Sequence, residues 1–170
     1  MRTVVITDEE LTSSPDDWWP SRLAGELTAA GAPVDVVTSP APGAGFTGSP
    51  TFAELVAAQA TGSTQLVVLV ETRLPDTDPA DLTSAWGRTM QAVEETAPDA
   101  RLVILGPFPR VSSPSVIDSL RGAIADAGAT YVDPTAENWP AEPSPEQMTA
   151  LVRPHMEALV RALAASGANR

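Results

Sequence analysis

Cysteine and lysine are absent from this 170-residue sequence, and histidine occurs once, at His155. Without cysteine the chain has no disulfide, thiolate metal site or cysteine nucleophile, so its chemistry depends on oxygen groups and one imidazole. No apolar run approaches the ~18 residues of a membrane span, which predicts no membrane partner. The chain becomes acidic at Asp8, too early for a secretory signal, so we expect cytoplasmic synthesis without export by that route.

Positive charge is also scarce. The ten basic residues are all arginines and are outnumbered by 22 acidic residues, which gives a formal net charge of -12. This charge opposes a phosphate backbone, so we predict that nucleic acid is not a partner. The length suits one hydrophobic core, and we expect a single domain over residues 1–165 followed by a tail over 166–170.

Five short apolar runs alternate with five helical patterns. The runs cover residues 3–6, 34–37, 66–70, 102–105 and 129–132. Uniformly apolar strands are typical of a parallel sheet covered by helices on both faces, which predicts an α/β fold built as a three-layer α/β/α sandwich. Ligands of such sheets bind beyond the carboxyl ends of the strands. The loops predicted to form that crevice are 7–14, 38–49, 71–76, 106–113 and 133–143.

Helix starts carry capping signals. A side-chain oxygen precedes a proline, or precedes by three residues a Glu or Gln that can close a capping box. These pairs are Thr51–Glu54, Asp78–Pro79, Ser113–Pro114 and Ser144–Gln147, and the predicted helix ends are Gly31, Gly62 and Gly128. Pro154 lies inside the last helical pattern and is expected to bend that helix or reset its start.

Several segments carry a family resemblance. The first strand leads into an acidic elbow and Leu11-Thr12, the fourth strand ends in Leu105-Gly106-Pro107, and Pro143-Ser144-Pro145 precedes the last helix. In this order and spacing the chain resembles the SGNH (GDSL-type) hydrolases over nearly its whole length. The resemblance implies a flavodoxin-like, five-stranded parallel sheet with strand order 2-1-3-4-5.

The catalytic positions of that family hold other residues in this chain. The positions of the nucleophilic serine, the oxyanion-hole asparagine, the aspartate and the histidine are occupied, in that order, by Glu10, Arg73, Trp139 and Glu142. Gly43 retains the oxyanion-hole glycine that follows the second strand. The resemblance therefore implies a catalytically degenerate member, a pseudoenzyme without catalytic residues or a cofactor.

His155 and two serines bear on that interpretation. His155 lies about three helical turns past the family's histidine position, too far along the last helix to reach the elbow. Serine is a poor nucleophile unless a base lies within hydrogen-bond reach. Ser13 and Ser14 are candidates for a displaced nucleophile, although turn or capping roles explain them more simply. We interpret His155 as a packed or partly exposed helical residue.

Acidic residues gather around the predicted crevice. They are Asp8, Glu9, Glu10, Glu71 and Glu142. Their oxygens are suitable ligands for Mg²⁺ or Ca²⁺, but we favour salt bridges to Arg73 and Arg110, or solvated carboxylates, and predict no metal. Glu10 and Glu142 form a weaker alternative, a carboxylate pair for acid–base hydrolysis.

Three tryptophans are candidate binding residues. Trp18 and Trp19 precede the first helix, and Trp139 lies on the last crevice loop. Exposed on loops, such side chains anchor a glycan or a protein partner. The alternative is that Trp19 packs at the helix start and Trp139 fills the vacated pocket.

These observations favour a non-catalytic SGNH-like domain that acts as a structural or binding module, with a protein or glycan partner. Arginine without lysine is typical of a high-GC genome such as that of an actinobacterium or its phages, and we hypothesise a virion-associated role as a decoration or tail component. The alternative is an enzyme: an esterase or acetyl-hydrolase with relocated groups, or a metal-assisted hydrolase that uses Asp8, Glu9 and Glu10. The sequence does not specify an oligomeric state.

Overall fold

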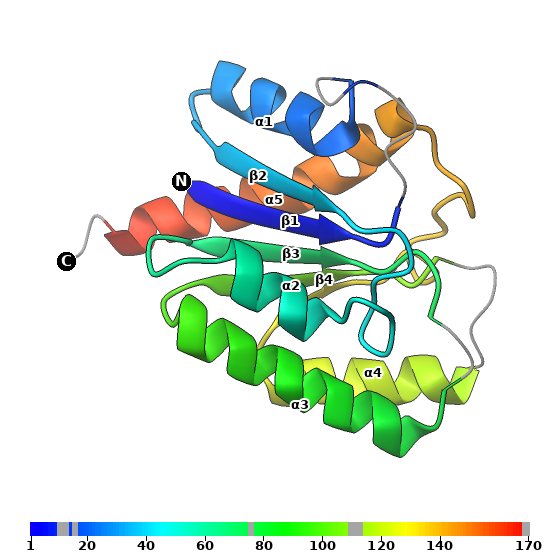
Figure 1. The fold of residues 1–170 in the computed structure, drawn as a ribbon. Coiled ribbons are helices and arrows are strands. Elements are labelled where there is room, and N and C mark those ends of the chain that lie inside the picture. The colour runs from blue at the N-terminus through cyan, green and yellow to red at the C-terminus, as the bar shows by residue number, and fades with distance from the viewer. Residues whose placement is uncertain (10–13, 15–16, 75–76, 109–113, 168–170) are drawn as a thin grey trace.

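The computed structural model describes residues 1–9, 14, 17–74, 77–108 and 114–167, and within them five strands alternate with five helices (Figure 1). The strands are β1 (Arg2–Thr7), β2 (Asp35–Pro40), β3 (Leu66–Val70), β4 (Arg101–Leu105) and β5 (Thr130–Val132). The helices are α1 (Trp19–Ala29), α2 (Phe52–Gln59), α3 (Pro79–Thr96), α4 (Pro114–Asp126) and α5 (Pro145–Gly167). Each predicted strand and helix is present.

The strands form one parallel sheet in the order β2-β1-β3-β4-β5. In its centre, Thr7 of β1 is the register partner of Pro40 in β2 and Val70 in β3, so these three strands end at the same edge. The predicted fold class and strand order are confirmed. Parallel strands require a crossover each time, which the intervening helices supply.

Helices cover both faces of the sheet. Figure 1 shows α1 and α5 on one side and α2, α3 and α4 on the other. Successive strand residues alternate between the two cores: Val4 and Ile6 pack with α2, α3 and α4, whereas Val5 packs with α1 and α5. Because both faces are buried, the strands are apolar throughout, which is the pattern seen in the sequence.

The capping signals mark the helix starts as predicted. At α2, Thr51 and Glu54 form a reciprocal capping box. At α5, the Gln147 N–H donates to Ser144 Oγ at 3.2 Å, and the Ser144 N–H donates to Gln147 Oε1 at 2.9 Å. Ser113 lies outside the described residues, although α4 begins at the following residue.

Asp78 caps α3 by accepting a hydrogen bond from the Ala80 N–H at 2.8 Å. Replacing Asp78 with alanine leaves that N–H without its side-chain partner and should lower the free energy of unfolding by about 1 kcal/mol. Asp78→Ser keeps an acceptor oxygen and should recover most of the loss. Urea denaturation of the three proteins tests this, and equal losses in both variants would contradict the capping role.

One of the three predicted helix ends needs revision. Gly31 and Gly128 have positive φ angles of 83° and 67° and follow α1 and α4, as expected. Gly62 does not end α2, because the chain turns into an extended conformation at Ala60, with φ -79° and ψ 155°. No left-handed residue is therefore required there.

Helix α5 continues through Pro154 and reaches Gly167. Pro154 therefore does not reset the helix start, and the helix extends two residues past the start of the tail that we predicted at residue 166. Over the part of the chain that the structure describes, no helix has the length and apolarity needed to cross a membrane.

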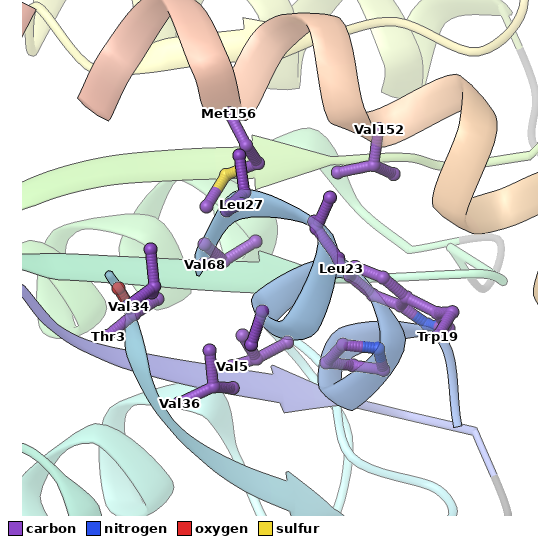
Figure 2. Close-up of a pocket in the computed structure, with 12 residues that line it drawn as sticks. Thr3, Val5, Trp19, Leu23, Leu27, Val34, Val36, Val68, Val152 and Met156 are labelled. Atoms are coloured by element: carbon purple, nitrogen blue, oxygen red, sulfur yellow. The ribbon is translucent and has the colours of Figure 1, made fainter. Parts of the chain in front are cut away.

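The packing of α1 and α5 on the sheet leaves one small apolar void. Figure 2 shows it between Leu23 and Leu27 of α1, Val152 and Met156 of α5, and Val68 of β3. Its volume of about 10 Å³ is near the minimum for one water molecule, and its walls offer almost no polar groups. It is a packing defect rather than a ligand site.

Candidate functional site

An open cleft of about 830 Å³ lies beyond the carboxyl ends of the strands. All five predicted crevice loops contribute to its lining, for example through Asp8 after β1, Gly43 after β2 and Phe108 after β4. The starts of α1 and α5 complete the wall with Trp19 and Pro145. The location predicted from sheet topology is confirmed.

Asp8 joins the ends of β1 and β3. Its carboxylate accepts hydrogen bonds from the Thr72 N–H at 3.0 Å, the Thr72 hydroxyl at 2.9 Å and the Arg73 N–H at 3.2 Å. Burial raises the pKa of Asp8 above its ordinary value, although these hydrogen bonds lower it in part. The chain's own carboxylate thus occupies the donors at the start of the loop that follows β3.

Glu9 lies on the cleft side of α1. Its Oε2 atom accepts from the Trp19 indole N–H at 3.4 Å and from the Thr7 hydroxyl at 3.5 Å. Burial, followed by the neighbouring charge of Asp8, raises the pKa of Glu9, whereas the hydrogen bond from Trp19 lowers it. The hydrogen bonds to Asp8 and Glu9 therefore offset only part of the cost of burying their negative charges.

Glu71 is the least solvated acid of the cleft. It follows β3 directly, its side chain is 1% exposed, and neither carboxyl oxygen has a hydrogen-bond partner. Burial raises the pKa of Glu71 well above its ordinary value, and the charge of Asp8 raises it further. The nearby Phe46 N–H opposes this shift, although it does not reach hydrogen-bond geometry with either oxygen.

Glycine is required where Glu71 meets the loop that follows β2. A Cβ at Gly45 would lie 2.7 Å from Glu71 Oε1, so a side chain there would displace the carboxyl group. In the same loop, Gly43 has a φ of 79° and lines the cleft, which places the residue at the oxyanion-glycine position inside the site.

Only some of the other residues at the family's catalytic positions lie in the cleft. Arg73 and Glu142 line the cleft and are exposed. Glu10, at the serine position, lies outside the described residues, as do Ser13 and Arg110. Trp139, at the aspartate position, lies behind the cleft wall rather than in its lining.

The favoured salt bridge at Arg73 does not form within the described residues. The backbone N–H of Arg73 contacts Asp8, and the guanidinium makes no ion pair with any residue whose position the structure gives. The same residues contain no group of three acidic or imidazole side chains arranged to hold a metal ion. The predicted alternative of a metal site includes Glu10, which lies outside the described residues.

The three candidate tryptophans are buried rather than exposed. Trp18, Trp19 and Trp139 are 3%, 2% and 5% exposed. Trp18 and Trp19 still line the cleft, whereas Trp139 packs on Phe108 with ring centroids 6.1 Å apart. The burial of Trp19 is the packing given above as the alternative, whereas Trp139 is not among the described residues that line the cleft. Contact of Trp18, Trp19 and Trp139 with a partner stays a prediction.

His155 and Ser14 are each engaged elsewhere. His155 Nε2 lies 3.1 Å from Glu137 Oε2, and its ring centroid lies 6.1 Å from that of Trp139. Ser14 is exposed, and its hydroxyl donates to Asp17 Oδ2 at 3.3 Å. His155 is partly exposed, as interpreted from the sequence.

Sequence reasoning missed two contributions to the cleft. Thr72 was not singled out, although it supplies two of the donors to Asp8. Its position directly after Glu71 in a crevice loop was the available signal. Met148 was not singled out either, and it lines the cleft because α5 begins at the edge where the strands end.

No protein-family model matches this sequence, and no curated protein sequence matches it. Solved structures do match its fold. A carbohydrate esterase family 2 enzyme with a carbohydrate binding domain, from Corynascus thermopiles (Myceliophthora fergusii), is 18% identical with a TM-score of 0.58, and the match covers 96% of this chain and 65% of that one. A family two carbohydrate esterase from Cellvibrio japonicus is 16% identical with a TM-score of 0.56, covering 96% and 62%. An extracellular lipase from Streptomyces rimosus is 12% identical with a TM-score of 0.47, covering 78% and 80%.

The chain spans less than two thirds of the length of either carbohydrate esterase. At these identities the likeness establishes the fold alone. That fold is an SGNH-hydrolase-like α/β sandwich, in agreement with the strand order and the flanking helices.

Proposed function

We propose that the protein is a non-catalytic module of SGNH-like fold whose cleft binds a partner and does not turn over an ester. The observation that carries the proposal is the position of the imidazole. His155, the only histidine of the sequence, is bonded to Glu137 and is not among the described residues that line the cleft. A serine nucleophile needs a base within about 3 Å, and no other imidazole is available.

The hydrogen bonds of Asp8 add support. Acyl transfer requires donors that are free to stabilise negative charge as it develops on the substrate oxygen. Here the N–H groups of Thr72 and Arg73 already donate to a carboxylate. A second negative charge beside Asp8 would be repelled, so this end of the cleft disfavours an oxyanion.

The rival function is ester hydrolysis, which the names of the two carbohydrate esterases of similar fold bring forward. Incubation with a fluorophosphonate probe should leave every hydroxyl unlabelled, and 4-nitrophenyl acetate should hydrolyse at the rate of buffer alone. Stoichiometric labelling of one serine would overturn the proposal.

Two serine variants identify the nucleophile if labelling occurs. Loss of label in Ser14→Ala, but not in Ser63→Ala, would establish the relocated-serine alternative. Ser63 is a matched control because it is also exposed and hydrogen-bonded, to Thr61, but precedes β3 and so lies at the opposite end of that strand from the cleft. The virion role stays a proposal from composition alone, and neighbouring genes would test it.

A further inference from the structure

The described lining of the cleft is strongly acidic. Asp8, Glu9, Glu71 and Glu142 contribute four acids against the single basic residue Arg73. The first three of these acids make no ion pair with any residue that the structure places. Carboxylates that are withdrawn from water without a cation are costly, so this lining favours a positively charged occupant.

The unpaired carboxyl oxygens of Glu71 are a second, independent indication that the cleft binds a partner. The register pairs Thr7 with Val70, so the next residues, Asp8 and Glu71, lie side by side at the edge of the sheet. The Glu71 side chain extends into the cleft wall beneath Gly45, and both of its oxygens lack a hydrogen-bond donor. Buried polar atoms in folded proteins almost always have a partner, so the unpaired oxygens of Glu71 show that the polar groups beside Asp8 are not fully satisfied by the chain itself.

Apolar side chains line the same cleft. They are Trp18, Trp19, Phe108 and Met148. A bare metal ion needs several oxygen ligands, and the described residues contain no three-ligand metal group. An ammonium group on a hydrocarbon stem matches both halves of the lining, because the stem packs on the aromatic rings while the cation lies beside the carboxylates.

We propose that the cleft accepts a lysine side chain of a protein partner, with the ammonium beside Asp8 and Glu9 and the methylene stem against Trp19. This inference deepens the proposed function and rests on it, because it names the group that the module binds. The chain itself contains no lysine, so a second copy cannot supply the side chain. The net charge of -12 also favours approach of a basic surface.

The test compares two peptides that differ only in charge, acetyl-Ala-Lys-Ala-amide and the same peptide with norleucine in place of lysine. Binding is followed by NMR through the four tryptophan indole N–H signals. Signals of Trp18 and Trp19 should shift, since both line the cleft and Trp19 donates to Glu9. Those of Trp86, in the core on the opposite face of the sheet, and Trp139 should not. We expect the lysine peptide to bind at least about tenfold more tightly than the norleucine peptide at low salt.

Charge-removing variants locate the ammonium. Glu9→Gln keeps an acceptor for Trp19 and should weaken lysine-peptide binding by about fivefold. Glu94→Gln removes the same charge from an exposed position on α3, and it should leave affinity unchanged. Asp8→Asn is a second variant that removes a charge, while its amide oxygen can still accept a hydrogen bond from Thr72, and it should also weaken binding.

Equal affinity for the two peptides would overturn the lysine inference, as would equal losses in Glu9→Gln and Glu94→Gln. Neither result would restore catalysis, because only covalent labelling or ester turnover contradicts the non-catalytic module. The two proposals therefore fail on different measurements.

Discussion

Replacement of Glu71 by glutamine is expected to stabilise the protein, by an amount that grows as the pH rises above about 5. Below its ordinary pKa of 4.5, Glu71 is protonated in both the folded and the unfolded chain. Above that pH the unfolded chain releases the proton while the folded chain retains it, because burial and the charge of Asp8 raise the folded pKa. The wild-type free energy of unfolding therefore falls until the pH passes the folded pKa.

Glutamine does not titrate, so the Glu71→Gln variant escapes this loss. Near pH 4.5 the two proteins should have similar stability, since a neutral carboxyl and an amide are both buried without partners. Near pH 8 the variant should be more stable by about 1–3 kcal/mol, because each pKa unit by which folding raises the pKa of Glu71 costs the wild type about 1.4 kcal/mol. Urea denaturation across the pH range measures the difference.

A matched variant separates this effect from the other acids. Asp8 and Glu9 also have raised pKa values, mainly through burial, and they contribute equally to the wild type and to Glu71→Gln. Glu94→Gln removes one carboxyl group from an exposed turn of α3 and controls for the loss of a negative charge from the chain. A stability gain in Glu71→Gln that does not vary with pH would contradict the assignment of the titration to Glu71.

The second large effect is expected at Gly106, which follows β4 beneath the cleft. Its φ is 111°, a conformation that side chains rarely adopt, and an added Cβ would overlap the carbonyl oxygen of Glu71. The obstacle is backbone of the central sheet, which cannot rotate away. Gly106→Ala should therefore lower the free energy of unfolding by about 3 kcal/mol or more.

Gly122→Ala is the matched control for that substitution. Gly122 lies on the exposed side of α4, where a Cβ meets no atom within 4 Å. Because alanine is the better helix former, this variant should be more stable than the wild type by about 0.5–1 kcal/mol. A loss below about 1 kcal/mol in Gly106→Ala would show that the strand end can move, and would contradict the close packing around Glu71.

Local signals were sufficient for the strands and helices, whereas the strand order came from the family resemblance. The uniformly apolar runs predicted buried parallel strands, and the oxygen-bearing residues at Thr51, Asp78 and Ser144 marked helix starts that the structure confirms. The error at Gly62 has a local cause as well: α2 ends in an extended residue, so a glycine two positions later was not the terminator. Boundaries are less predictable than elements because several backbone conformations can end a helix.

The candidate site was predictable in position but not in its contacts. Sheet topology placed the cleft, and the acids that follow β1 and β3 were recognised as its chemistry. The favoured partner of those acids was Arg73, yet within the described residues only its backbone N–H meets Asp8. Tryptophans at positions 18 and 19 were expected on loops, but the packing of α1 against α5 and the sheet buries them.

The sequence by itself determined which reactive groups exist: no thiol, no lysine, one imidazole and an excess of carboxylates. That inventory is independent of conformation. Only the tertiary structure decided that Asp8 occupies the donors of Thr72, that Glu71 is sealed beneath Gly45, and that His155 pairs with Glu137. The physical reason is that solvation and contact depend on which distant segments pack together, and those distances are set by strand register and helix packing rather than by any local pattern.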